Sequence, residues 1–147
     1  MKKETIIKKL IDKDNKKAYE YAKVIGIESA KTDKYLDMIS EFASMLKDKN
    51  SLIRTRFFIL ICNQARWANN KQIEDVYEQM EVLLYDSNPI VVRQCLKALH
   101  EIALFRPEMC DAIKNTISKI DLSIYKDSMV SLIKKDIDEL MKRVSNQ

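Results

Sequence analysis

The chain contains very little glycine and proline, with one Gly and two Pro in 147 residues. Folds built from strands need many tight turns, and such turns use more of both residues. This shortage therefore argues against a strand-rich fold. With 46% hydrophobic and 33% charged residues, the composition predicts an all-helical protein.

The chain also lacks the residues of an ordinary metal site or disulfide framework. It has a single histidine, His100, and its three cysteines, Cys62, Cys95 and Cys110, show no CxxC spacing. We expect His100 to lie half-exposed on a helix surface and the thiols to be reduced and packed as small apolar groups. Cys110, early in its helix, is expected to have a somewhat lowered pKa. No catalytic constellation is evident, so we expect a protein that is not an enzyme and uses no cofactor.

Neither a strong charge nor a long apolar run is present. The net charge is +4, and basic pairs such as Lys134-Lys135 are interleaved with acidic residues. A nucleic-acid-binding module more often shows a basic stripe, so these pairs indicate solvated helix faces. Near the N-terminus, Lys8 and Lys9 interrupt the apolar residues. We therefore expect neither a signal peptide nor a membrane span, and we predict a cytoplasmic protein.

What the sequence does contain is a repeated unit. Polar turns that begin with Asp12, Asp48, Asp86 and Asp121 recur every 35 to 38 residues, with two amphipathic helices in each interval. This periodicity is typical of an α-α superhelix, in which helix pairs stack on one another. We expect one domain, residues 1–147, of about four helix pairs, with approximate repeats 1–28, 29–67, 68–105 and 106–147.

Two features of the individual helices give sharper expectations. Gly26 is expected to end its helix with a left-handed cap. The helix predicted from Leu52 to Trp67 is apolar over most of its circumference, which indicates a buried helix.

The string Asp-Ser-Asn-Pro-Ile-Val-Val-Arg, from Asp86 to Arg93, resembles the turn and second helix of a HEAT repeat, and residues 48–66 resemble the same unit. Segments Arg56–Trp67, Pro89–Ile102 and Tyr125–Met129 resemble a family of small bacterial HEAT-like proteins sometimes labelled "SufBD protein". The resemblance implies a right-handed HEAT/armadillo-like solenoid. The label implies an accessory role in iron–sulfur cluster assembly, although assembly scaffolds of that name have β-helical cores that this chain does not resemble.

Aligning the turns places equivalent positions of successive second helices in rows. Asn63, Glu101 and Asp136 fall in one polar row, and Trp67 begins an aromatic and apolar row beside it. In a HEAT-like solenoid the second helices line the concave surface, so the resemblance implies that these rows face a partner. An exposed Trp–Arg pair, such as Trp67 with Arg56, is a typical anchor of protein interfaces. The candidate binding residues are Arg56, Asn63, Trp67, Arg93, Gln94, Lys97, Glu101 and Asp136.

These residues predict a non-enzymatic module that binds a protein or peptide on its concave face. The alternative is binding of a nucleic-acid phosphate backbone by a basic strip of Arg54, Arg56, Arg66, Arg93 and Lys97. The same residues also have a purely structural interpretation, in which they contact neither a partner nor phosphate. One or two of the arginines then pair with turn aspartates of the neighbouring repeat and fix the stacking. Trp67 caps the core end of its helix.

Overall fold

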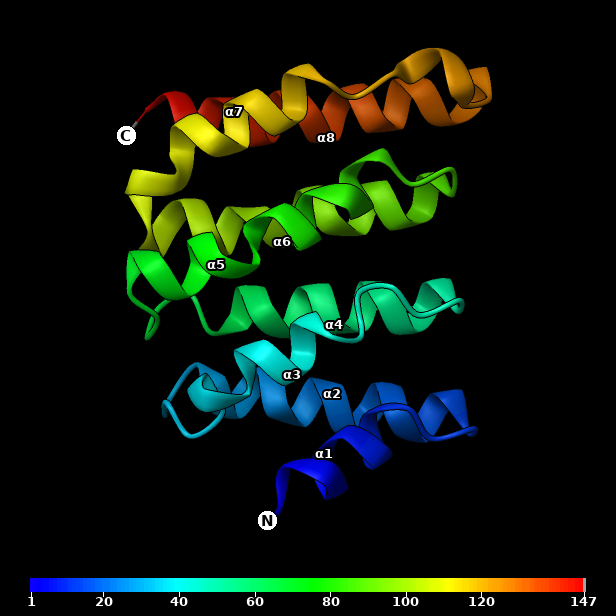
Figure 1. Ribbon diagram of the computed structural model, residues 1–147. Coiled ribbons are helices and arrows are strands. Elements are labelled where there is room, and N and C mark those ends of the chain that lie inside the picture. Colours follow the sequence, from blue (N-terminus) through cyan, green and yellow to red (C-terminus); the bar gives the residue numbers. More distant parts are fainter. Residues whose placement is uncertain (147) are drawn as a thin grey trace.

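The computed structural model describes residues 1–146, which form eight α-helices joined by short connections (Figure 1). The α-helices are α1 (Lys3–Leu10), α2 (Asn15–Ser29), α3 (Ile39–Ala43), α4 (Ser51–Asn63), α5 (Asn70–Glu81), α6 (Pro89–Phe105), α7 (Cys110–Ser118) and α8 (Asp127–Ser145). Four short 3-10 helices lie between them: η1 (Leu36–Met38), η2 (Val82–Tyr85), η3 (Pro107–Met109) and η4 (Leu122–Ile124). These residues contain no strand, so the all-helical prediction is confirmed. No helix in residues 1–146 combines the length and apolar character needed to cross a lipid bilayer.

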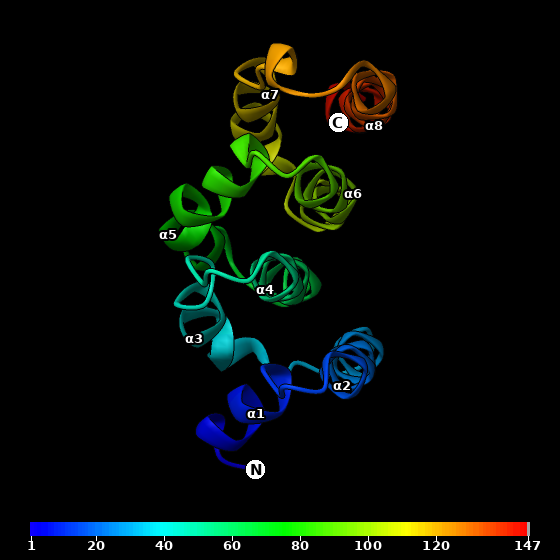
Figure 2. The same ribbon diagram turned by 90° about the vertical axis from the view of Figure 1, so that its right-hand side faces the viewer.

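The helices lie in two layers that the chain enters alternately. Figure 2 shows α1, α3, α5 and α7 in one layer and the mostly longer α2, α4, α6 and α8 in the other. Within the second layer, α2 packs against α4, α4 against α6, and α6 against α8. All four of these helices begin at the same edge of the molecule, so they run parallel to one another (Figure 1).

The polar turns before α4 and α6 contain the same hydrogen bonds. In each turn the aspartate accepts from a backbone N–H two residues later: Asn50 donates to Asp48 at 2.8 Å, and Asn88 donates to Asp86 at 2.9 Å. The asparagine side chain then accepts at 2.9 Å from the first turn of the helix and caps it. The similarity of the two turns in sequence therefore corresponds to the same local geometry.

Arg54, in the first turn of α4, joins these two turns. Its Nη1 donates to the backbone oxygens of Asp48 at 3.0 Å and Lys49 at 3.1 Å, and its Nη2 pairs with Asp86 Oδ2 at 2.8 Å. The Tyr125 hydroxyl donates to the backbone oxygen of the same Asp86 at 2.6 Å. The prediction that an arginine pairs with a turn aspartate of the next unit is therefore confirmed.

The hydrophobic core lies between the two layers. Phe42 on α3 and Phe57 on α4 are fully buried, with ring centroids 5.8 Å apart. The predicted burial of α4 is confirmed along most of its length, but Leu52 at its start is 54% exposed. The helix also ends earlier than predicted, at Asn63, and the chain then turns through residues 64–67.

Gly26 does not end α2. The helix continues to Ser29, and no residue among 1–146 has a positive φ. A Cβ atom at position 26 would lie 3.2 Å from Oδ1 of Asn63, so the missing side chain gives the Asn63 amide room against α2. The expected left-handed cap is therefore wrong, because close approach of two helices accounts for the glycine here.

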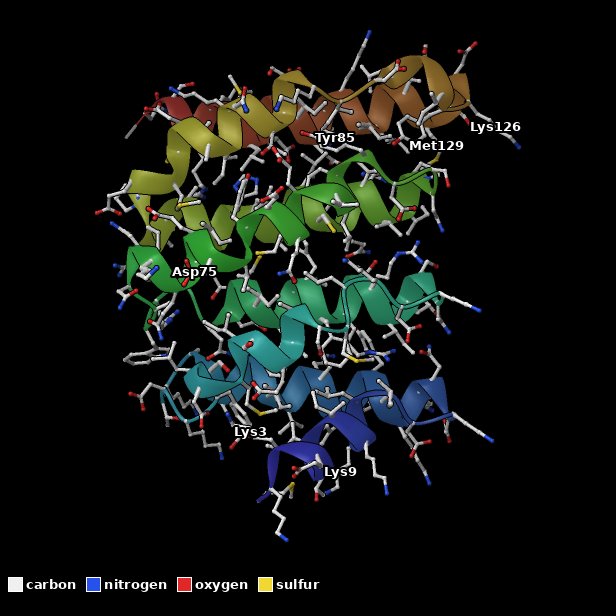
Figure 3. The ribbon with its side chains drawn as sticks, viewed as in Figure 1. Lys3, Lys9, Asp75, Tyr85, Lys126 and Met129 are labelled. Atoms are coloured by element: carbon white, nitrogen blue, oxygen red, sulfur yellow. The ribbon has the colours of Figure 1, made fainter. Side chains whose placement is uncertain are left out.

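Polar side chains also join neighbouring helices of the first layer. Lys3 on α1, labelled in Figure 3, donates to Glu41 on α3 at 3.0 Å. Tyr85 of η2, also labelled, donates to the backbone oxygen of Thr116 on α7 at 3.0 Å. The hydroxyls of Thr116 and Tyr77 lie 2.7 Å apart in the core. Hydrogen bonds thus supplement apolar packing along this layer.

Candidate functional site

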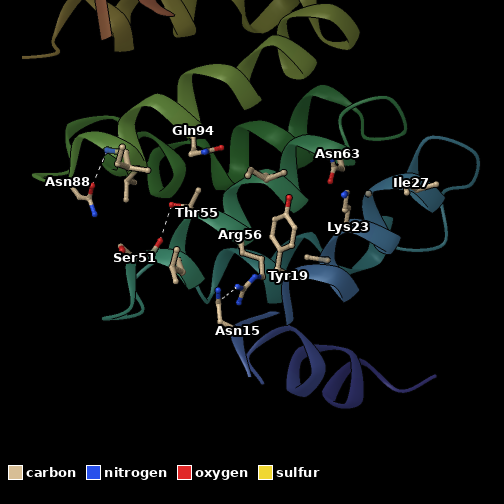
Figure 4. A pocket seen from close by; sticks show the side chains of 16 residues that line it. Asn15, Tyr19, Lys23, Ile27, Ser51, Thr55, Arg56, Asn63, Asn88 and Gln94 are labelled. Atoms are coloured by element: carbon tan, nitrogen blue, oxygen red, sulfur yellow. Dashed lines mark hydrogen bonds between the residues drawn. The ribbon is translucent and has the colours of Figure 1, made fainter. Parts of the chain in front are cut away.

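The second layer carries a groove over its first three helices. Figure 2 shows α4 set back behind α2 and α6. An open groove of about 660 Å³ follows this recess, with α4 as its floor and α2 and α6 as its walls (Figure 4). The residues that line this α2–α4–α6 groove are Asn15, Tyr19, Ala22, Lys23, Gly26 and Ile27 from α2; Ser51, Leu52, Thr55, Arg56, Ile59 and Asn63 from α4; and Asn88, Ile90, Val91 and Gln94 from the start of α6.

Four large apolar side chains of the groove remain exposed. Tyr19 is 54% exposed, Ile27 58%, Leu52 54% and Ile90 52%. Exposed apolar side chains gathered in one concave place are a feature of binding sites. Leu52 and Ile90 hold the same position after the turns at Asp48 and Asp86. The alignment of the two turns could therefore have indicated this surface, but the predicted rows did not include these two residues.

The groove contains positive charge but no carboxylate. Lys23 and Arg56 are its only charged lining residues within the described chain. Lys23 is exposed, its ammonium lies 5.9 Å from the centre of the Tyr19 ring, and in Figure 4 it points toward Asn63. Arg56 is buried at the base of the groove, and burial lowers the pKa of its guanidinium. Lys23 is therefore the cation that a ligand can reach.

The structure brings Asn63 and Glu101 together, as their equivalent positions predicted. The Asn63 amide donates to Glu101 Oε1 at 2.9 Å and connects α4 with α6. Burial raises the pKa of Glu101, while the hydrogen bond from Asn63 and the charge of Arg66 act in the opposite direction. Asn63 also lines the groove, together with Gln94 and Arg56. Three of the eight predicted residues thus belong to one surface.

Arg93, Lys97 and Asp136 do not line the groove, and Arg93 meets Asp136 where α6 packs against α8. Arg93 Nε donates to Asp136 Oδ2 at 2.6 Å, and Nη2 approaches Oδ1 at 3.4 Å. The Asp136 side chain is only 4% exposed, and its hydrogen bond and charge raise the pKa of Arg93. The predicted polar row therefore stops at Glu101, because the next carboxylate is buried against an arginine. Lys97 is exposed one turn further along α6.

Trp67 does not pair with Arg56. Because α4 ends at Asn63, the following turn carries the indole to the end of α2, where Nε1 donates to the backbone oxygen of Ser29 at 2.7 Å. Trp67 is still 38% exposed. Arg56 instead reaches the connection between α1 and α2: Nη1 donates to the backbone oxygen of Leu10 at 2.8 Å, and Nη2 donates to Asn15 Oδ1 at 2.6 Å.

The other arginines of the predicted basic strip are also engaged within the chain. Arg54 pairs with Asp86, and Arg93 pairs with Asp136. Arg66 donates to the backbone oxygen of Ala30 at 3.1 Å, and its guanidinium lies 4.5 Å from the centre of the Phe105 ring. A phosphate group would have to compete with these contacts, which weakens the case for a nucleic-acid interface.

The three cysteines are free and buried. Burial raises the pKa of the Cys62, Cys95 and Cys110 thiols. The expected lowering for Cys110 is therefore wrong: its side chain packs into the core, although it begins α7. In residues 1–146 no group of three or more His, Cys, Asp or Glu side chains is placed to hold a metal ion.

His100 is half-buried on α6, near the C-terminal end of α8. Its Nδ1 accepts a hydrogen bond from Nε of Arg143 at 2.8 Å. Burial lowers the pKa of the imidazole from its ordinary value of 6.5, and the charge of Arg143 acts in the same direction. Glu139 and Asp136 oppose this shift. The folded protein therefore favours the neutral form of His100 more strongly than the unfolded chain does.

We expect the free energy of unfolding to fall as the pH drops below 6.5, the ordinary pKa of His100, because the unfolded chain then binds the proton more tightly than the folded chain. Above that pH the imidazole is neutral in both states, and its contribution is complete. Urea titrations between about pH 7.5 and about pH 5.5 measure this slope. The slope should decrease in His100→Gln and stay unchanged in Lys97→Gln. An equally steep profile for His100→Gln would contradict the assignment.

Comparison with known proteins gives no relative from which a role can be transferred. No family model, curated protein or solved structure matches this chain. The α2–α4–α6 groove is therefore the basis for a functional proposal.

Proposed function

We propose that this chain is a HEAT-like solenoid of four helix pairs that acts as a non-enzymatic protein-interaction module. It binds a protein or peptide in the α2–α4–α6 groove, on the concave face of its second helices. The alternation of the two layers and the identical turns before α4 and α6 support the solenoid. The proposed relationship to the HEAT-like proteins labelled "SufBD protein" rests on the sequence resemblance alone.

The observation that carries the binding proposal is the gathering of four half-exposed apolar side chains in one groove. Burying the exposed half of each of Ile27, Leu52 and Ile90 contributes on the order of 1 kcal/mol. Tyr19 adds a ring with a hydroxyl at its outer end, a side chain common at protein interfaces. Side chains from three helices thus offer a partner apolar contacts within one groove.

The chemistry of the lining supports binding over catalysis. No carboxylate, histidine or cysteine lines the α2–α4–α6 groove within residues 1–146. General acid–base or nucleophilic catalysis usually depends on such groups. The groove instead contains apolar side chains, amides, hydroxyls and two cations, which suits recognition of a peptide.

We expect Ile90→Asp to weaken partner binding at least tenfold, because it places a charge in the apolar surface. Asp near the N-terminus of α6 is compatible with the helix, so the fold should persist. Ile124→Asp is the matched control: Ile124 is 55% exposed on η4, outside the groove, whereas Ile90 is 52% exposed within it. Immobilised wild-type and variant proteins are incubated with a bacterial lysate, and retained proteins are quantified by mass spectrometry. If Ile90→Asp retains the same proteins in the same amounts as wild type, the groove is not the binding site.

A further inference from the structure

The α2–α4–α6 groove is elongated along α4, and this shape fits a helix. Its floor follows α4 from Ser51 to Asn63, α2 lines one side from Asn15 to Ile27, and the start of α6 lines the other side as far as Gln94. The three helices run parallel to one another (Figure 1). The 13 residues of α4 span about 20 Å. A helix laid along this floor packs on α2 and α4 and on the first turns of α6, in the way that neighbouring helices pack in proteins. The length and direction of the groove therefore fit a helix of about three or four turns.

The groove offers few free polar groups to the backbone of an extended peptide. An extended backbone needs partners for its N–H and C=O groups when it leaves water. The Thr55 hydroxyl already donates to the backbone of Ser51 at 2.9 Å, and the Asn63 amide donates to Glu101. The hydroxyls of Tyr19 and Ser51 and the side chain of Gln94 make no hydrogen bond inside the described structure, and they are few for the backbone groups of an extended segment as long as the groove. A helix satisfies its own backbone and needs few such partners.

The positive charge of the groove favours a bound helix with acidic side chains along one side. Lys23 stands exposed on the α2 wall, and no lining carboxylate compensates its charge in residues 1–146. Acidic side chains on the occupant are attracted to this position. Helix α1 of a second copy is a poor occupant because it carries Lys3, Lys8 and Lys9 against a single acid, Glu4 (Figure 3 labels Lys3 and Lys9). Helix α5 is acidic, but its apolar face is already buried in the core.

We infer that the α2–α4–α6 groove binds an amphipathic helix of another protein, with an apolar stripe and an acidic flank. The stripe, repeating every three or four residues, packs on Tyr19, Leu52 and Ile90, and the acidic flank lies beside Lys23. This inference rests on the proposed function, since it names the chemistry of the partner that the groove binds.

A peptide selection tests this assignment without knowledge of the natural partner. A phage-displayed library of random 16-residue peptides is selected on the wild-type protein and then screened on Ile90→Asp and Ile124→Asp. Peptides that bind wild type and Ile124→Asp, but not Ile90→Asp, report on the groove. We expect these peptides to carry apolar residues at helical spacing and a net negative charge. Circular dichroism of both variants confirms that they are folded.

Two follow-up measurements on a selected peptide separate helix formation from charge. Proline in the middle of the peptide should weaken binding at least tenfold, because it interrupts the helix. Lys23→Gln should weaken binding about threefold, with the difference disappearing at high salt. Lys16→Gln is the matched control, since Lys16 is exposed on the same helix and does not line the groove.

The outcomes distinguish this inference from the function on which it rests. Groove-dependent peptides with alternating apolar residues, tolerance of proline or a net positive charge would overturn the acidic helix and leave the binding function intact. If no peptide distinguishes wild type from Ile90→Asp, the proposed function fails together with the inference.

Discussion

Replacing Arg93 with alanine is expected to lower the free energy of unfolding by about 3 kcal/mol. The reason is the surroundings of Asp136, whose side chain is 4% exposed and accepts from Arg93 Nε at 2.6 Å. Without the guanidinium, a carboxylate that is almost fully buried in the α6–α8 contact loses the cation that donates to it. Urea unfolding followed by circular dichroism measures the change.

Two further variants show whether the buried charge is the cause. Lys97→Ala removes an exposed cation one turn further along α6, so it should change the free energy of unfolding by less than about 0.5 kcal/mol. The double variant Arg93→Leu with Asp136→Leu should recover most of the loss, because an apolar pair of similar volume replaces both charges. A loss as small as that of Lys97→Ala would show that Asp136 is adequately solvated without Arg93.

Arg56→Ala is expected to lower the free energy of unfolding by about 2 kcal/mol. The guanidinium is buried and donates to the backbone oxygen of Leu10 and to Asn15 Oδ1, so it holds the α1–α2 connection against α4. Arg56→Lys should rescue little, since one ammonium cannot reproduce the two-pronged geometry. Urea unfolding gives the magnitude. Relative to wild type, backbone hydrogen exchange should become faster in α1 and α2 and stay unchanged in α8.

Arg56→Ala also tests whether Arg56, a predicted binding residue, contacts the partner. Lys23→Ala is the control: Lys23 is exposed in the groove, so this variant should keep its free energy of unfolding within about 0.5 kcal/mol of wild type. If Arg56→Ala weakens partner binding, it should do so by loosening the α2 wall and with a loss of stability. Unchanged stability with reduced binding would instead mean that the Arg56 guanidinium contacts the ligand directly.

The helices and turns were predictable because their signals are local. The turns at Asp48 and Asp86 use hydrogen bonds within five residues, so the sequence of the turn is enough to define them. Gly26 was misinterpreted because its requirement comes from Asn63, far along the chain. The end of α4 was misplaced for a similar reason: apolar periodicity continues to Trp67, but its indole hydrogen-bonds to Ser29 on another helix.

The candidate site was predictable only in part. Equivalent positions correctly brought Asn63 beside Glu101, because adjacent parallel helices place such positions opposite each other. The alignment gave no information on which carboxylates are buried, so it included Asp136 in the same surface. Leu52 and Ile90 were overlooked because apolar residues in an amphipathic helix are assigned to the core by default. Their exposure depends on the recess of α4 between its neighbours, which is a property of the whole stack.

The two matching turns also bear on how such a chain changes in length. Each turn contains its own cap, and the link between turns is a single arginine, Arg54, that reaches the next aspartate. A second copy of residues 48–85 would contain both the capped turn and the linking arginine. A tandem duplication of this segment therefore keeps the hydrogen bonds that the turn and the link between turns need. Gene duplication can then lengthen the protein in whole units, each of which adds one helix to the layer that carries the groove.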